Sequence, residues 1–109
     1  MRFKDKVVVI TGAGSGIGRS IAINFAKEGA IVVVNDINLE SAEKVAEEIK
    51  SLNTESMILH GDATNEQEVK KMVEEVIRRL GKIDILVNNV GRFVYRKPII
   101  EMGTEEWDE

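Results

Sequence analysis

Short apolar runs alternate with longer amphipathic stretches along this chain of 109 residues. The apolar runs are rich in β-branched residues and nearly continuous, which is typical of strands buried on both faces, and they cover residues 7–10, 30–34, 57–59 and 83–87. The three stretches between them repeat apolar residues at helical spacing. The order β-α-β-α-β-α-β predicts an α/β fold with a parallel sheet.

The amphipathic stretches carry signals for their ends. Helices are predicted over residues 17–28, 39–49 and 65–80. Gly29 and Gly81 follow the first and the third of them, where a left-handed glycine commonly ends a helix. Residues 64–67 read Thr-Asn-Glu-Gln, which has the spacing of a capping box and predicts Thr64 as the cap of the third helix.

Right-handed crossovers limit how these elements are arranged. With the strand order 3-2-1-4, the first two helices cover one face of the sheet and the third helix covers the other. We predict a doubly wound, Rossmann-type parallel sheet in a three-layer α/β/α arrangement, formed by residues 1–109 as a single domain.

Charge and composition exclude several classes of function. The net charge of −4 argues against a nucleic-acid partner, because phosphate binding needs clustered lysine and arginine. No apolar run approaches the ~20 residues that a membrane span requires. The first residues contain no apolar segment typical of a secretory signal, so we expect a cytoplasmic protein. The absence of cysteine excludes disulfides and thiolate metal sites, and we expect no metal site.

A glycine-rich turn joins the first strand to the first helix, where residues 11–18 read Thr-Gly-Ala-Gly-Ser-Gly-Ile-Gly. Glycines at this place permit a tight turn, a close approach of the backbone to a pyrophosphate, and close packing of helix on strand. The free N–H groups and the positive dipole end of the helix would receive the diphosphate. A structural turn without a ligand is the alternative; the strand before it, the helix after it and an acidic residue downstream favour the nucleotide site.

That acidic residue is Asp36, at the end of the second strand and close to the expected ~20 residues beyond the last glycine. A carboxylate there would accept hydrogen bonds from the ribose hydroxyls of NAD and repel the 2′-phosphate of NADP. Where NADP-binding proteins carry a basic residue, this chain has Ser15 and Ile37, and Arg19 is expected to face solvent. We therefore predict NAD rather than NADP. A helix cap or loop carboxylate is the alternative for Asp36.

The motif Thr11-Gly12-x-x-x-Gly16-x-Gly18, together with Asn88-Asn89-Val90-Gly91 after the fourth strand, resembles the short-chain dehydrogenase/reductase family. Both motifs stand at the family's spacing, and the match covers essentially the whole chain. The resemblance implies the cofactor-binding part of an oxidoreductase that transfers a hydride between NAD(H) and a small alcohol or carbonyl substrate. It does not separate branches such as the glucose 1-dehydrogenases and the 3-oxoacyl-(acyl carrier protein) reductases.

The resemblance also implies which residues contact the cofactor. Asp36 would hold the adenosine ribose, and Ile37 would lie against the adenine. Asp62 would accept a hydrogen bond from the adenine amino group, with Ala63 beside it; a charge at a helix N-terminus is the alternative for Asp62. The residues implied along the pyrophosphate and the adjoining ribose are Gly12, Ser15, Gly16, Ile17 and Gly18.

The segment after the fourth strand completes the implied site. Asn89, Val90 and Gly91 would pass along the middle of the cofactor, while Asn88 would tie the strand to its neighbours. The family usually has alanine where this chain has Val90, so two extra methyl groups would crowd the cofactor there.

No catalytic residue is assigned. In this family a tyrosine, made acidic by a lysine four positions later, moves the hydroxyl proton with help from a serine and an asparagine. These positions lie beyond Glu109 in a complete member, so we expect the chain alone to be inactive. Tyr95 is followed four positions later by Ile99 and is predicted to lie in a solvated loop. His60 is predicted to be a packed strand residue rather than a metal ligand.

Two other functions remain open at this point. A stand-alone NAD-binding module or pseudoenzyme would bind the cofactor without reacting it, and the short helix start at Thr104 counts against it. An S-adenosylmethionine-dependent methyltransferase shares the glycine-rich turn, but the motifs at Thr11 and Asn88 count against it. We also expect residues 92–109 to pack poorly and the exposed edge of the fourth strand to favour self-association.

Overall fold

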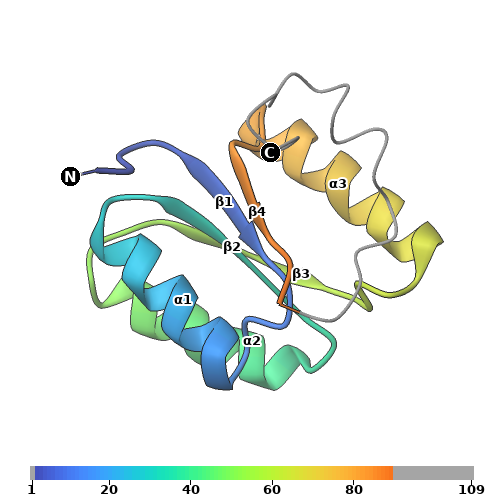
Figure 1. The fold of residues 1–109 in the computed structure, drawn as a ribbon, viewed down its shortest axis with the longest axis horizontal. Coiled ribbons are helices and arrows are strands. Elements are labelled where there is room, and N and C mark those ends of the chain that lie inside the picture. Colours follow the sequence, from blue (N-terminus) through green and yellow to red (C-terminus); the bar gives the residue numbers. More distant parts are fainter. Residues whose placement is uncertain (1, 90–109) are drawn as a thin grey trace.

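Four parallel strands and three helices make up the part of the chain that the computed structural model describes, residues 2–89 (Figure 1). The strands are β1 (Val7–Ile10), β2 (Ile31–Asp36), β3 (Ser56–His60) and β4 (Ile85–Val87). The helices are α1 (Gly16–Lys27), α2 (Leu39–Lys50) and α3 (Glu66–Leu80). The predicted order of elements is therefore confirmed. The predictions for Val90, Gly91, Tyr95, Thr104 and residues 92–109 lie outside the described residues.

The sheet has the strand order β3-β2-β1-β4. In the register of the ladder, Val8 of β1 lies between Val32 of β2 and Ile85 of β4. All four residues of β1 are buried, as expected for a strand with neighbours on both sides and helices on both faces. The predicted order 3-2-1-4 is confirmed. The carboxyl ends of the strands meet at one edge of the sheet, the edge at which ligands bind in open parallel sheets.

Side chains that alternate along the strands form two apolar layers. Helices α1 and α2 cover one face of the sheet and α3 covers the other, as predicted (Figure 1). The strand residues under α1 and α2 are Val8, Ile10, Val32 and Val34. Those under α3 are Val7, Val9, Val33, Met57 and Leu59.

The helix ends follow the local signals with one correction. Gly29, just after α1, and Gly81, at the end of α3, have φ values of 90° and 83°, the left-handed conformation predicted for them. The predicted cap at Thr64 is wrong: Asn65 caps α3, and its side chain accepts a hydrogen bond from the backbone N–H of Glu68. The hydroxyl of Thr64 is already bonded to the carboxylate of Asp62, which explains the one-residue difference.

No helix within residues 2–89 combines the length and the hydropathy needed to cross a membrane.

Candidate nucleotide-binding site

The glycine-rich turn after β1 folds back tightly on the start of α1. Gly12 and Gly16 have φ values of 62° and 58°, which side-chain-bearing residues rarely adopt. At Gly18, an added Cβ would lie 2.1 Å from the carbonyl oxygen of Gly12 and 2.7 Å from Nδ2 of Asn89. The helix therefore packs so closely on the turn that only glycine fits at position 18. An added Cβ at Gly16 would meet nothing within 4 Å, so that position faces open space.

The N-terminus of α1 carries free hydrogen-bonding capacity. Ser15 occupies the cap position, but its side chain makes no capping hydrogen bond, and the first turn contains no acidic residue. The first N–H groups of a helix have no partner within the helix, and the helix dipole makes this end positive. An anion at this place would accept hydrogen bonds from these N–H groups and lie at the positive end of the dipole. The turn therefore suits a diphosphate by its chemistry as well as by the open space beside Gly16.

The segment after β4 is tied to the same turn. The backbone N–H of Asn89 donates to Oγ1 of Thr11 at 2.9 Å, and Nδ2 of Asn89 donates to the carbonyl oxygen of Gly12 at 3.2 Å. The hydroxyl of Thr11 also lies 3.4 Å from Oδ1 of Asn88. Since Thr11 is buried at the end of β1, these bonds fix Asn88 and Asn89 against the glycine-rich turn.

Asp36 ends β2 and reaches back to the turn. Its Oδ2 accepts a hydrogen bond from the backbone N–H of Gly14 at 2.8 Å, and its Oδ1 accepts one from the backbone N–H of Asn38 at 2.9 Å. Asn38, rather than Asp36, caps α2. A carboxylate offers about four acceptor positions, so these two bonds leave capacity for the hydroxyls of a ribose.

The turn between β3 and α3 lies next to Asp36. The backbone N–H of Gly61 donates to the carbonyl oxygen of Asp36 at 3.1 Å. The Asp62 carboxylate accepts hydrogen bonds from the hydroxyl and the backbone N–H of Thr64, which hold the pKa of Asp62 below its ordinary value. Asp62 is therefore charged at neutral pH. Ala63 is buried beside it.

Exposed apolar side chains are also concentrated at this edge of the sheet. The large apolar side chains that remain exposed within residues 2–89 are Ile17 at 73%, Ile37 at 66% and Leu39 at 41%. Ile17 stands in the first turn of α1, and the other two follow the end of β2. Apolar surface gathered beside unpaired N–H groups is typical of a ligand site.

The model of the short chain dehydrogenase family matches residues 6–109. The chain belongs to this family. Among its curated relatives, the 7α-hydroxysteroid dehydrogenase of Escherichia coli (strain K12) is 48% identical over 91 residues, which are 84% of this chain and 36% of that protein. An uncharacterized oxidoreductase of Thermotoga maritima is 42% identical over 109 residues, all of this chain and 42% of that protein.

Solved structures of short-chain dehydrogenases have the same fold. A crystal structure of NAD⁺-bound xylitol dehydrogenase superposes with a TM-score of 0.80 at 37% identity, covering 84% of this chain and 35% of that one. The structure of the Escherichia coli hydroxysteroid dehydrogenase gives a TM-score of 0.79 at 48% identity, covering 83% of this chain and 38% of that one. The chain thus spans roughly two fifths of the length of these short-chain dehydrogenases.

His60 departs from its prediction. It is exposed rather than packed, because it is the last residue of β3, and its Nε2 lies 3.0 Å from the carbonyl oxygen of Ile37. This contact joins the end of β3 to the loop that carries Ile37. The part of the chain described by the structure contains no cluster of side chains suited to a metal ion.

Two residues at this edge were missed by the sequence analysis. Gly14 donates to Asp36 and leaves no room for a side chain, since an added Cβ would lie 2.7 Å from Oδ2 of that carboxylate. Asn35 is a buried polar residue that directly follows the apolar run of β2. The apolar run of the sequence ends at Val34, so the burial of Asn35, like the contact of Gly14, required the three-dimensional structure.

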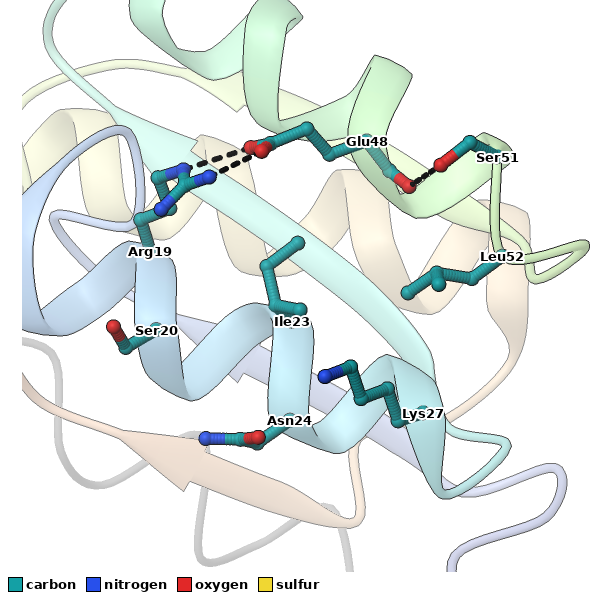
Figure 2. A pocket seen from close by; sticks show the side chains of 8 residues that line it. All are labelled: Arg19, Ser20, Ile23, Asn24, Lys27, Glu48, Ser51 and Leu52. Carbon is teal, nitrogen blue, oxygen red and sulfur yellow. Dashed lines mark hydrogen bonds and ion pairs between the residues drawn. The ribbon is translucent and has the colours of Figure 1, made fainter.

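A separate hollow of about 360 Å³ lies between α1 and α2, away from the glycine-rich turn (Figure 2). Arg19 reaches across it from α1 to Glu48 of α2, and Nε of Arg19 donates to Oε1 of Glu48 at 2.8 Å. Arg19 is exposed, as predicted, and is in addition paired with Glu48. The hydrogen bond from Arg19 lowers the pKa of Glu48, and the same bond raises the pKa of Arg19.

Proposed function

We propose that this chain is the NAD-binding part of an oxidoreductase that transfers a hydride between NAD(H) and a small alcohol or carbonyl substrate. The observation that carries the proposal is the uncapped N-terminus of α1, with the Asp36 carboxylate held beside it by Gly14. Diphosphate and ribose are adjacent in a dinucleotide, so the helix N-terminus and the Asp36 carboxylate would bind two neighbouring parts of one ligand.

The proposed roles are those that the resemblance to the family implies. Asp36 accepts hydrogen bonds from the adenosine ribose, Ile37 covers the adenine, and Asp62 accepts from the adenine amino group next to Ala63. Asn89, with Val90 and Gly91 after it, borders the middle of the cofactor. The residues proposed to hold the pyrophosphate and adjoining ribose are Gly12, Ser15, Gly16, Ile17 and Gly18. Bound NAD supplies the hydride acceptor for oxidation of an alcohol.

Family membership supports the class of reaction. The relatives named above are a hydroxysteroid dehydrogenase and an oxidoreductase, and the xylitol dehydrogenase structure was solved with NAD⁺ bound. The two dehydrogenases are named for a hydroxysteroid and for xylitol, both of which carry hydroxyl groups, in line with the class of reaction we propose here. We assign no substrate, and we assign proton transfer to no residue of this chain.

Electrostatics favour NAD over NADP. A unit charge of a 2′-phosphate placed about 4 Å from the Asp36 carboxylate would be repelled by about 4 kcal/mol at an effective dielectric constant of ~20. No cation offsets this repulsion at Ser15 or Ile37. Arg19, the nearest candidate in the sequence, is paired with Glu48 on the outer side of α1 and α2.

Calorimetric titration of NAD and NADP into the 109-residue chain and its Asp36→Asn variant tests the proposal. Asparagine keeps an acceptor for the N–H of Gly14 but loses the charge, so we expect NAD to bind about tenfold more weakly and the preference over NADP to shrink. Glu43→Gln, which removes one charge from an exposed position of α2, is the control and should change neither affinity. A folded wild-type chain without NAD affinity, or equal NAD affinity in Asp36→Asn, would refute the proposal.

A further inference from the structure

Asn35 is a buried amide near the end of β2, where it follows three valines and precedes Asp36. It is 2% exposed, and the preceding residues 32–34 of β2 are fully buried. A buried amide is costly unless its hydrogen bonds are made within the protein. Its Nδ2 lies 2.9 Å from the carbonyl oxygen of Leu59, 3.1 Å from that of Gly61 and 3.2 Å from Sδ of Met72. The side chain thus bonds the end of β3 and also the turn beyond it.

The backbone of Asn35 is tied to the other side of the site. Its carbonyl oxygen accepts a hydrogen bond from the N–H of Ala13 in the glycine-rich turn at 2.8 Å. One residue therefore connects the turn after β1, through its backbone, with the turn after β3, through its side chain. Gly61 lies past His60, the last residue of β3, so the regular β2–β3 ladder does not supply the side-chain bond.

The turn that Asn35 holds carries Asp62. An added Cβ at Gly61 would lie 2.9 Å from Sδ of Met72, so this turn rests directly on α3. The backbone N–H of Asp62 donates to Oε1 of Glu68 at 2.8 Å. These contacts fix the turn from the side of α3, and the amide of Asn35 fixes it from the side of β2. A hydrophobic residue at position 35 would fill the space but leave the Gly61 carbonyl group without this donor.

We propose that Asn35 is a positioning residue for the adenine end of the cofactor, acting through the Gly61 carbonyl group to place Asp62. The assignment rests on the proposed function, in which Asp62 accepts a hydrogen bond from the adenine amino group. It adds a residue that never touches the cofactor yet governs which base the site prefers. Loss of the Asn35 amide lets the turn shift, and Asp62 then no longer distinguishes an amino group from an oxo group.

Nicotinamide hypoxanthine dinucleotide is the probe that separates this role from general stability. It carries an oxo group where NAD carries the adenine amino group, so a correctly placed Asp62 carboxylate accepts from NAD and repels the analogue. We expect the wild-type chain to bind NAD about fivefold more tightly than the analogue, the worth of one hydrogen bond. In Asn35→Leu the two dissociation constants should become nearly equal. Asn35→Ala, which adds no bulk against Met72, should give the same result.

Val33→Ala is the matched control, because Val33 lies two residues earlier on the same face of β2 and makes no polar bond to the turn. It should lower stability and leave the ratio of the two dissociation constants unchanged. Amide hydrogen exchange is a second measurement, made on the protein without cofactor. The N–H of Gly61 should exchange faster in Asn35→Leu than in Val33→Ala. Unchanged ratios in both Asn35 variants, or equal exchange at Gly61, would overturn the role of Asn35. Absence of NAD binding by the folded wild-type chain would instead overturn the proposed function and the adenine role with it.

Discussion

The N-termini of α1 and α3 are built in opposite ways. Asn65 caps α3 by accepting a hydrogen bond from the N–H of Glu68 at 3.0 Å, and the first turn of α3 carries Glu66 and Glu68. Ser15 occupies the same position in α1 without making a capping bond, and no acidic residue follows it. Helix α2 follows the pattern of α3, with Asn38 as its cap and Glu40 in its first turn. Helices α2 and α3 stabilise their own positive ends, and α1 does not.

The start of α1 is held in place without a cap. Close packing of Gly18 on the Gly12 carbonyl group and the bonds of Asn89 hold the turn against the start of α1. Tertiary contacts therefore replace the local stabilisation that a cap typically contributes, about 1 kcal/mol. The free N–H groups and the dipole at this end stay available to an anionic ligand.

The largest effect is expected where the turn of α1 is most crowded. Gly18→Ala places a methyl group 2.1 Å from the carbonyl oxygen of Gly12, so the helix or the turn must move, and we expect a loss of about 3 kcal/mol in the free energy of unfolding. Gly16→Ala meets open space and should cost only about 1–2 kcal/mol, from its φ of 58°. Urea unfolding measures both. Equal losses would show that α1 is not held by this contact.

A smaller effect separates the capped helices from the uncapped one. Asn65→Ala and Asn38→Ala each remove a capping bond and should lower the free energy of unfolding by about 1 kcal/mol. Ser15→Ala removes no such bond and should change it by less than about 0.5 kcal/mol. The comparison breaks down if urea unfolding gives Ser15→Ala the same loss as the two asparagine variants.

The smallest effect is a pH dependence at the start of α3. The hydroxyl and then the N–H of Thr64 hold the pKa of Asp62 below its ordinary value of 3.8. The ionised carboxylate thus stabilises the fold above that ordinary pKa, and this contribution is lost as the pH falls through the lowered folded pKa. Urea midpoints measured from pH 6 to pH 3 should fall less steeply in Asp62→Asn than in the wild-type chain. Parallel curves would contradict the assignment.

Much of the fold could be predicted because its signals are local. The β-branched runs and the helical spacing gave the right order of elements, and the crossover rule gave the strand order. The cap of α3 could not be placed to the residue, because Thr64 and Asn65 are both good caps and a suitable partner follows each at the same spacing. The bond from Thr64 to Asp62, a feature of the folded turn, decides between them.

The candidate site was only partly accessible to sequence reasoning. Glycine spacing and Asp36 marked the turn and the end of β2, since both follow from the order of strand, turn and helix. The link from Asn35 to Gly61, the bond from Gly14 to Asp36, and the pairing of Arg19 join segments distant in sequence. Such contacts depend on how neighbouring strands and helices end in space, which a pattern along the chain does not contain.

Calorimetric titration of NAD into the wild-type chain and into Ser15→Asp tests most directly whether the uncapped end of α1 receives a diphosphate. An aspartate at this position would cap the helix and place a negative charge at its positive end. We predict that the variant unfolds at a higher urea concentration than the wild-type chain but binds NAD at least about tenfold more weakly, because its carboxylate repels the ligand and competes for the same N–H groups. Equal NAD affinity in the two proteins would contradict the account.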